Sequence, residues 1–179
     1  KEEITTSKKW ILLARKYLQK YDHNIKIGSG TNVLFTDLNR STASFEDMDL
    51  VSYSINPQVH AFDNLSLIET LSAQPETVKS ARQFSNNKFI AVSPITLKMR
   101  FNPFATSLEK GLKSNQLPSQ VDVRQMSLFG AGWTVGSLKY LCESEAYSLT
   151  YYETTGWRGV METKYGSIVP EKFFSFKES

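Results

Sequence analysis

Segments with helical periodicity alternate with strand-like segments along this chain, an order that few folds accommodate. Residues 7–21 carry apolar and aromatic side chains at helical spacing, with basic residues off that stripe, which predicts a helix with one apolar face. Residues 24–30 predict a short strand that is ended by its glycines. Residues 49–56 alternate apolar and polar side chains, which predicts a strand with one buried face.

A broken helix and a buried strand are predicted next. Asp63 or Asn64 is a suitable N-cap for one helical stretch, and Pro75 is placed to open a second. Residues 89–97 are an almost continuous apolar run, typical of a strand covered on both faces. Pro94 predicts a bulge or an early end to that strand, because proline has no backbone N–H to donate.

The last two predicted elements are a long helix over residues 124–141 and a strand over residues 146–153. Gly130, Gly132 and Gly136 lower the helix propensity of the first of these. We therefore expect the glycines to allow a neighbouring segment to approach the helix closely.

Strands joined by helices predict right-handed crossovers and a parallel α/β sheet. About four strands are half of the set that closes a (β/α)8 barrel. We therefore predict that residues 1–161 form the C-terminal half of a (β/α)8 TIM barrel, with crossover helices, and that residues 162–179 begin a further C-terminal element. The open sheet edges predict a partner, either a missing N-terminal half-barrel or a second copy of the chain.

Composition narrows the range of partners. Lys and Arg number 21 against 18 Asp and Glu, and they are scattered, so neither nucleic acid nor a membrane is expected to bind. The lone Cys142 cannot form an internal disulfide. His23 and His60 do not have the spacing of a metal site, and nothing in the sequence indicates a cofactor. These features predict a cytoplasmic protein with a small polar ligand.

Polar side chains gather where the predicted strands end, which in parallel α/β folds is the end that binds ligands. The clusters are Asp37, Asn39 and Arg40; Asn56, Gln58, His60 and Asp63; Lys98, Arg100 and Asn102; and Glu153, Thr154, Thr155, Trp157 and Arg158. Each cluster alone fits an ordinary polar loop. Their shared position predicts a single polar rim.

Glu153 and His60 are the candidate catalytic residues. Glu153 follows two tyrosines at a strand end, where partial burial favours a carboxylate that takes up protons near neutral pH. It reaches the rim only if the strand ends or bends there, and a structural pairing with Arg158 is the alternative. His60 carries an imidazole that can give or take a proton, or serve only as a hydrogen-bonding group.

The other candidates fit a substrate rich in hydroxyl and carboxylate groups. Guanidinium groups hold carboxylates and oxyanions, amides both donate and accept hydrogen bonds, and an indole ring packs on the apolar face of a sugar. The predicted substrate-binding residues are Asn39, Arg40, Asn56, Gln58, Arg100, Asn102, Trp157 and Arg158. For each arginine, a structural salt bridge is the alternative.

Longer strings at the same strand ends resemble a known family. They are residues 35–40 (FTDLNR), 54–63 (SINPQVHAFD), 69–71 (ETL), 92–97 (VSPITL), 100–103 (RFNP), 124–130 (RQMSLFG) and 151–159 (YYETTGWRG). These strings resemble the D-apionate lactonases, bacterial sugar-acid lactone hydrolases whose relatives look like glycoside-hydrolase barrels. Asp37 stands where Glu would be expected in that family. Its members are several times longer and have an upstream half-barrel.

The resemblance implies a hydrolase that opens a branched-pentose lactone, similar to D-apionolactone, to the free acid in apiose breakdown. From the residues, we expect Glu153, with His60, to activate water while Arg100 or Arg40 stabilises the oxyanion. Two alternatives remain. One is a retaining glycosidase in which Glu153 pairs with a second carboxylate, and the other is a non-catalytic carbohydrate-binding domain.

Overall fold

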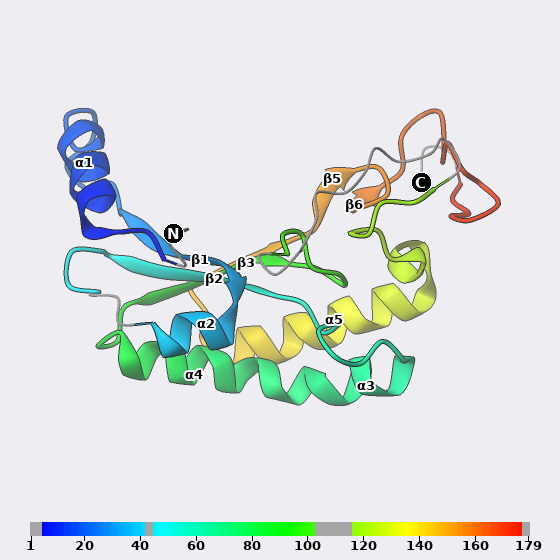
Figure 1. Ribbon diagram of the computed structural model, residues 1–179, viewed down its shortest axis with the longest axis horizontal. Coiled ribbons are helices and arrows are strands. Elements are labelled where there is room, and N and C mark those ends of the chain that lie inside the picture. Colours follow the sequence, from blue (N-terminus) through cyan, green and yellow to red (C-terminus); the bar gives the residue numbers. More distant parts are fainter. Residues whose placement is uncertain (1–4, 42–44, 103–115, 177–179) are drawn as a thin grey trace. The chain divides into compact units, whose positions relative to one another are not determined.

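The computed structural model describes residues 5–41, 45–102 and 116–176 (Figure 1). The chain divides into two compact units. Unit 1 comprises residues 1–55, 72–94 and 140–150, and unit 2 comprises residues 56–71, 95–139 and 151–179. The end of the predicted C-terminal element, residues 177–179, lies outside the described residues. Of the helices in the described ranges, none is long and apolar enough to cross a membrane.

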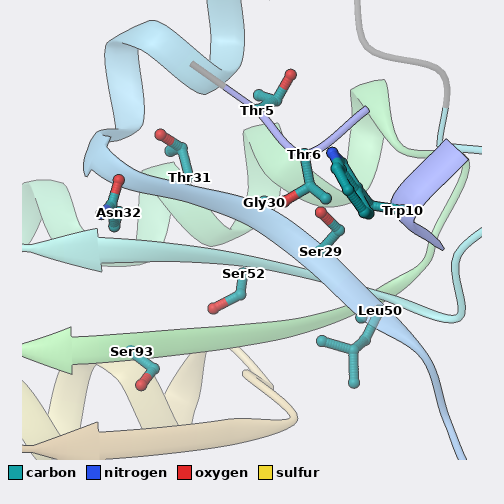
Figure 2. A pocket seen from close by; sticks show the side chains of 11 residues that line it. Thr5, Thr6, Trp10, Ser29, Gly30, Thr31, Asn32, Leu50, Ser52 and Ser93 are labelled. Carbon is teal, nitrogen blue, oxygen red and sulfur yellow. The ribbon is translucent and has the colours of Figure 1, made fainter. Parts of the chain in front are cut away.

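Unit 1 contains almost all of a four-stranded sheet with the strand order β1-β2-β3-β4. The strands are β1 (Gly28–Leu34), β2 (Leu50–Ile55), β3 (Phe89–Ile95) and β4 (Ser148–Tyr151). β1 and β2 pair in parallel, with Gly28 opposite Leu50 and Gly30 opposite Ser52. The arrowheads of the four strands point the same way in Figure 2. The predicted parallel α/β sheet is therefore confirmed.

Strand β1 begins and ends later than the sequence predicted. We expected the strand to end at Gly30, but Gly30 lies inside β1. A Cβ atom at this position would lie 1.6 Å from the carbonyl oxygen of Ser52, so a side chain there would push β1 away from β2. Close packing of two strands, and not a turn, is the reason for this glycine.

Helices α2 (Phe35–Arg40) and α4 (Gln74–Phe84) cover one face of this sheet (Figure 1). Pro75 lies in the first turn of α4, as predicted. The hydroxyl groups of Tyr53, on β2, and Thr77, on α4, form a hydrogen bond of 2.7 Å. The side chains at the centre of this core are fully buried, namely Val51, Tyr53, Val78, Ala81, Ile90 and Val92. Ser52 and Ser54 face the other way and are partly exposed, so the predicted alternation of β2 is confirmed.

Helix α1 (Lys8–Leu18) confirms the predicted first helix, but its apolar stripe is not buried. Ile11 is the one buried residue of α1, whereas Trp10 and Tyr17 are 51% and 52% exposed. Arg15 forms an ion pair with Asp49 at 3.0 Å, just before β2. Polar contacts therefore contribute to holding α1, in addition to its single buried side chain.

Unit 2 contains α3 (Asn64–Glu69), the 3-10 helix η2 (Val123–Met126), most of α5 (Leu128–Glu143), β5 (Glu153–Thr155) and β6 (Gly159–Met161). The short 3-10 helix η1 (Thr70–Ala73) follows α3, so the predicted broken helix is confirmed. Asp63 caps α3 by accepting a 2.9 Å hydrogen bond from the backbone N–H of Ser66. Trp133 is fully buried, and its indole N–H donates to the Leu67 carbonyl at 3.1 Å.

The glycines of α5 confirm close approach at two positions out of three. A Cβ atom at Gly130 would lie 2.4 Å from the carbonyl oxygen of Arg124, and one at Gly136 would lie 2.9 Å from the Leu71 side chain. Gly132 has nothing within 4 Å, so no packing constraint explains it. The helix also begins later than predicted, since η2 and Ser127 precede it.

Candidate functional site

A sharp bend separates β4 from β5, and Glu153 is the first residue after it. Tyr152 has a φ of 52°, in the left-handed region that a residue with a side chain rarely occupies. Tyr152 is buried and its hydroxyl group hydrogen-bonds that of Thr134 at 2.7 Å, which holds the bend in place. The Glu153 side chain therefore does not follow the alternating directions of the β4 side chains. Such a bend is what the sequence analysis required for Glu153 to reach the rim.

Two arginines flank the Glu153 carboxylate within unit 2. Arg158 Nε lies 3.0 Å from Glu153 Oε1, and Arg100 Nε lies 3.6 Å from the same oxygen. The backbone N–H of Glu153 also donates to the Arg158 carbonyl at 3.0 Å. The structural pairing of Glu153 with Arg158 is therefore present, and it places one anion between two cations.

The two arginines differ in how firmly they are held. Arg100 donates to the carbonyl oxygens of Gln120 at 2.8 Å and Arg158 at 3.1 Å, and its side chain is largely buried. Burial lowers the pKa of Arg100, but an arginine remains protonated in proteins. Arg158 is more exposed, and its terminal guanidinium nitrogens bind no other residue in the described part of the chain. Arg158 is thus the cation that a ligand can reach.

Glu153 and Arg158 border a hollow of about 390 Å³, which we call the Glu153 hollow. Its described walls are Pro118, Gln120, Val121, Glu153, Thr155, Gly156, Trp157 and Arg158. The Trp157 indole N–H donates to the Ser167 hydroxyl at 3.1 Å, which fixes the ring at the edge of this hollow. The hollow combines a carboxylate, a guanidinium, a hydroxyl group and an aromatic ring, which suits a small polar ligand.

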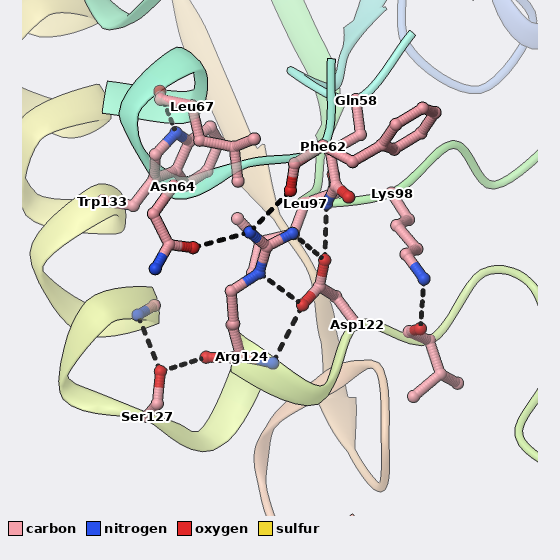
Figure 3. Close-up of polar contacts among 12 residues, drawn as sticks. Gln58, Phe62, Asn64, Leu67, Leu97, Lys98, Asp122, Arg124, Ser127 and Trp133 are labelled. Carbon is pink, nitrogen blue, oxygen red and sulfur yellow. Dashed lines mark hydrogen bonds and ion pairs between the residues drawn. The ribbon is translucent and has the colours of Figure 1, made fainter. Parts of the chain in front are cut away.

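A buried polar network lies beside this site and contains a residue that the sequence analysis did not single out, Asp122 (Figure 3). Asp122 is 4% exposed and accepts hydrogen bonds from Arg124, through its backbone N–H and its guanidinium, and from Gln58. Burial alone would raise the pKa of Asp122, but these donors outweigh it and lower the pKa to about 2. Asp122 is therefore an anion at neutral pH inside unit 2.

The same network joins segments that are far apart in the sequence. The Gln58 amide donates to the Leu97 carbonyl at 2.7 Å and to Asp122 at 2.5 Å. Arg124 donates to the Phe62 carbonyl at 3.0 Å (Figure 3). With its amide nitrogen engaged on both sides and its side chain buried, Gln58 connects protein segments, and its role in substrate binding stays a prediction.

Other predicted residues lie outside the Glu153 hollow. His60 and Asn102 are exposed, and His60 forms no hydrogen bond or ion pair with another described residue. Asn56 carries a buried side-chain oxygen without a hydrogen-bond partner among the described residues. Asn39 and Arg40 are exposed on α2, in unit 1. Among the residues that the structure places, no group of three His, Cys, Asp or Glu side chains could hold a metal ion.

Comparison with known proteins points to one family. The family model described as "D-apionate lactonase, TIM barrel domain" matches residues 13–175. A protein of Brucella anthropi named D-apionate lactonase is 39% identical over 83 residues, which are 46% of this chain and 14% of that protein. The matched part thus spans about one seventh of this relative's length. No solved structure matches the chain.

Proposed function

Because this chain belongs to the D-apionate lactonase TIM-barrel family, we propose that it takes part in the hydrolysis of a sugar-acid lactone to the free acid, with the Glu153 hollow as the reaction site. The name of the Brucella anthropi relative supports a lactone as the substrate class. One structural observation carries the choice of site, namely a carboxylate 3.0 Å from a partly exposed guanidinium at a hollow of small-molecule size.

Lactone hydrolysis requires a group that takes a proton from water and a group that stabilises negative charge on oxygen. In the proposed mechanism the oxygen of water attacks the lactone carbonyl carbon, and Glu153 takes up the proton that this oxygen loses. The carbonyl oxygen becomes an oxyanion, which the terminal N–H groups of Arg158 stabilise. The ring C–O bond then breaks, and the leaving oxygen takes the proton from Glu153. The products are a free hydroxyl group and a carboxylic acid, which releases its proton to the solvent to become the carboxylate.

Arg158 also suits the product. A guanidinium binds a carboxylate through two parallel hydrogen bonds, and the terminal nitrogens of Arg158, which bind no other described residue, are available for such binding. Arg100 is assigned a positioning role, because its nitrogens are engaged with Gln120, Arg158 and Glu153. Trp157 and Thr155 line the same hollow and are assigned to sugar binding. A catalytic part for His60, and substrate contacts for Asn39, Arg40, Asn56 and Asn102, stay predictions.

The glycosidase alternative has less support. A retaining glycosidase needs two carboxyl groups about 5 to 5.5 Å apart. Of the described residues that line the Glu153 hollow, Glu153 is the carboxylate, and no second one is among them. A carbohydrate-binding domain without activity would share the same walls, and it differs from the lactonase only in producing no acid.

The test compares substrate classes on the wild-type protein. We expect acid release from D-apionolactone, followed by titration at constant pH, and no release of nitrophenol from aryl glycosides of pentoses. Arg158→Ala should weaken inhibition by the product acid by about 10-fold or more, because the guanidinium pairs with its carboxylate. Inhibition of Arg158→Lys by the product acid should be weaker than in the wild type and stronger than in Arg158→Ala, because lysine keeps the positive charge but not the two parallel N–H donors. Nitrophenol release without acid release, or product inhibition that is unchanged in both variants, would overturn the proposal.

A further inference from the structure

Trp157, the aromatic wall of the Glu153 hollow, contacts the last part of unit 2. Its indole N–H donates to the Ser167 hydroxyl group at 3.1 Å. The oxygen of that hydroxyl group also accepts the backbone N–H of Val169 at 3.2 Å. Ser167 therefore holds the edge of the indole ring and is itself held by the backbone that follows it. We call residues 162–173 the support segment.

The support segment is anchored on both sides of Ser167. Val169 is 4% exposed and Glu162 is 5% exposed. The Glu162 carboxylate accepts the backbone N–H of Thr163 at 2.7 Å. Gly166 has a φ of 74°, in the left-handed region that favours glycine, and its N–H donates to the Thr163 carbonyl at 2.9 Å. This turn therefore presents the Ser167 hydroxyl group in one defined position.

The hydrogen bond to Ser167 determines what Trp157 can offer a ligand. An indole ring has one hydrogen-bond donor, its N–H, and no acceptor. Trp157 is partly exposed and lines the Glu153 hollow, but Ser167 occupies its donor, so the carbon surface of the ring is what remains for a ligand. Such a surface packs on the C–H face of a sugar ring. The groups that bind substrate hydroxyl groups must then come from other walls, such as Thr155 and Gln120.

We propose that Ser167 is a positioning residue of the Glu153 hollow, and that Trp157, which it holds, binds the C–H face of the lactone ring. The proposal rests on the proposed function, because it takes this hollow as the reaction site. Ser167 is not among the described residues that line the hollow, so it acts through Trp157. The support segment thereby takes part in substrate binding, and the substrate turns C–H groups, not hydroxyl groups, toward this wall.

The first measurement follows the Trp157 indole N–H by NMR and needs no substrate. The chain has three tryptophans, and the Trp157 resonance is the one that disappears in Trp157→Phe. In Ser167→Ala this resonance should shift upfield and its hydrogen should exchange with solvent faster, because the hydroxyl acceptor is gone. Ser167→Thr keeps a hydroxyl group and should retain the wild-type resonance.

The second measurement is the affinity for D-apionolactone, determined by saturation-transfer NMR on Glu153→Gln protein so that the lactone is not consumed. Ser167→Ala should weaken binding by about 5-fold, the equivalent of one hydrogen bond, and Ser167→Thr should not. Trp157→Phe, which keeps an aromatic ring but not the N–H, should weaken binding about as much as Ser167→Ala does. Trp157→Ala, which removes the ring, should weaken it by about 10-fold or more. Adding Ser167→Ala to Trp157→Phe should cause no further loss, because both changes remove the same hydrogen bond.

Ser127→Ala is the matched control for folding. The Ser127 hydroxyl group also accepts a backbone N–H, that of Gly130, at 3.2 Å, but Ser127 does not line the Glu153 hollow. Ser127→Ala and Ser167→Ala should lower the thermal midpoint to a similar extent. Only Ser167→Ala should change the affinity for the lactone.

The proposal is overturned if the lactone does not bind at millimolar concentration, if Ser167→Ala leaves the indole resonance or the affinity unchanged, or if Trp157→Ala leaves the affinity unchanged. It is also overturned if Ser167→Ala weakens binding equally in Trp157→Phe protein, which would mean a role in folding alone. Hydrolysis by the wild-type protein tests the proposed function separately. A lactone that binds but is not hydrolysed refutes the proposed function, whereas a hydrolysed lactone with unchanged affinity in Ser167→Ala refutes only the positioning role.

Discussion

Asp122→Asn removes the negative charge at the centre of the buried network in unit 2 and should destabilise the protein by about 2 kcal/mol at pH 7. The pKa of Asp122 is lowered from its ordinary 3.8 to about 2. At about 1.4 kcal/mol per pH unit, that interval corresponds to roughly 2.5 kcal/mol. Since solvent reaches part of the Arg124 partner, screening lowers the expected effect to about 2 kcal/mol.

The dependence on pH follows from the direction of the pKa change. A carboxyl group with a lower pKa in the folded state adds stability that is complete above its unfolded pKa and is lost as the pH falls through the folded pKa. For Asp122 this window runs from 3.8 down to about 2. The difference between wild type and Asp122→Asn should therefore be about 1 kcal/mol smaller at pH 3 than at pH 7.

Urea unfolding followed by circular dichroism at the two pH values measures both quantities. Asp63→Asn is the matched control, because Asp63 is an exposed helix cap and asparagine caps helices about equally well. Its effect should be much smaller than that of Asp122→Asn, because the cap hydrogen bond can be kept by asparagine. The reasoning is refuted if Asp122→Asn costs less than about 0.5 kcal/mol at pH 7, or if its cost is the same at pH 3.

Four further substitutions test the packing and the position of the site. Gly132→Ala should stabilise the protein by up to about 1 kcal/mol, because the new methyl group meets nothing within 4 Å and alanine favours a helix. Gly130→Ala should destabilise the protein by about 1–3 kcal/mol, because its Cβ would lie 2.4 Å from the Arg124 carbonyl oxygen. Urea unfolding should give free-energy changes of opposite sign for the two variants, and equal signs contradict this reasoning. Thr134→Val removes the hydrogen bond to Tyr152 and should cost about 1 kcal/mol in the same assay, while no loss would show that the bend does not depend on that bond. Arg100→Lys keeps the positive charge but loses the guanidinium group that binds two carbonyl oxygens. The kcat/KM of this variant for the lactone should fall by about 10-fold, with little change in its free energy of unfolding. If the variant keeps the wild-type kcat/KM, Arg100 has no positioning role.

Local sequence patterns predicted most helices and strands, because a helix or strand depends largely on residues that are close in the sequence. Helical spacing predicted α1 and α5, alternation predicted β2, and Asp63 predicted the start of α3. Strand β1 was misplaced because glycine ends strands in one context and permits close strand packing in another. The structure shows that the second applies at Gly30, because the carbonyl oxygen of Ser52 on β2 leaves no room for a Cβ atom there.

Contacts between distant residues could not be predicted from a single sequence. Gln58 meets Leu97 and Asp122 across 39 and 64 positions, and no local pattern distinguishes that buried amide from one that binds substrate. The pairing of Glu153 with Arg158 was predicted as the alternative role of Glu153, whereas the place of Arg100 beside the same carboxylate was predicted only as part of a shared rim. The positive φ of Tyr152, which turns Glu153 out of β4, has no signature in a tyrosine pair.

The rate of lactone hydrolysis by Glu153→Gln tests the central proposal most directly. Glutamine keeps the size of the side chain but cannot take a proton from water, so kcat should fall by about 100-fold or more with a smaller change in KM. Glu171→Gln makes the same chemical change at an exposed position outside the Glu153 hollow and should keep the wild-type rate. If Glu153→Gln hydrolyses the lactone as fast as Glu171→Gln does, Glu153 is not the general base and the reaction site lies elsewhere.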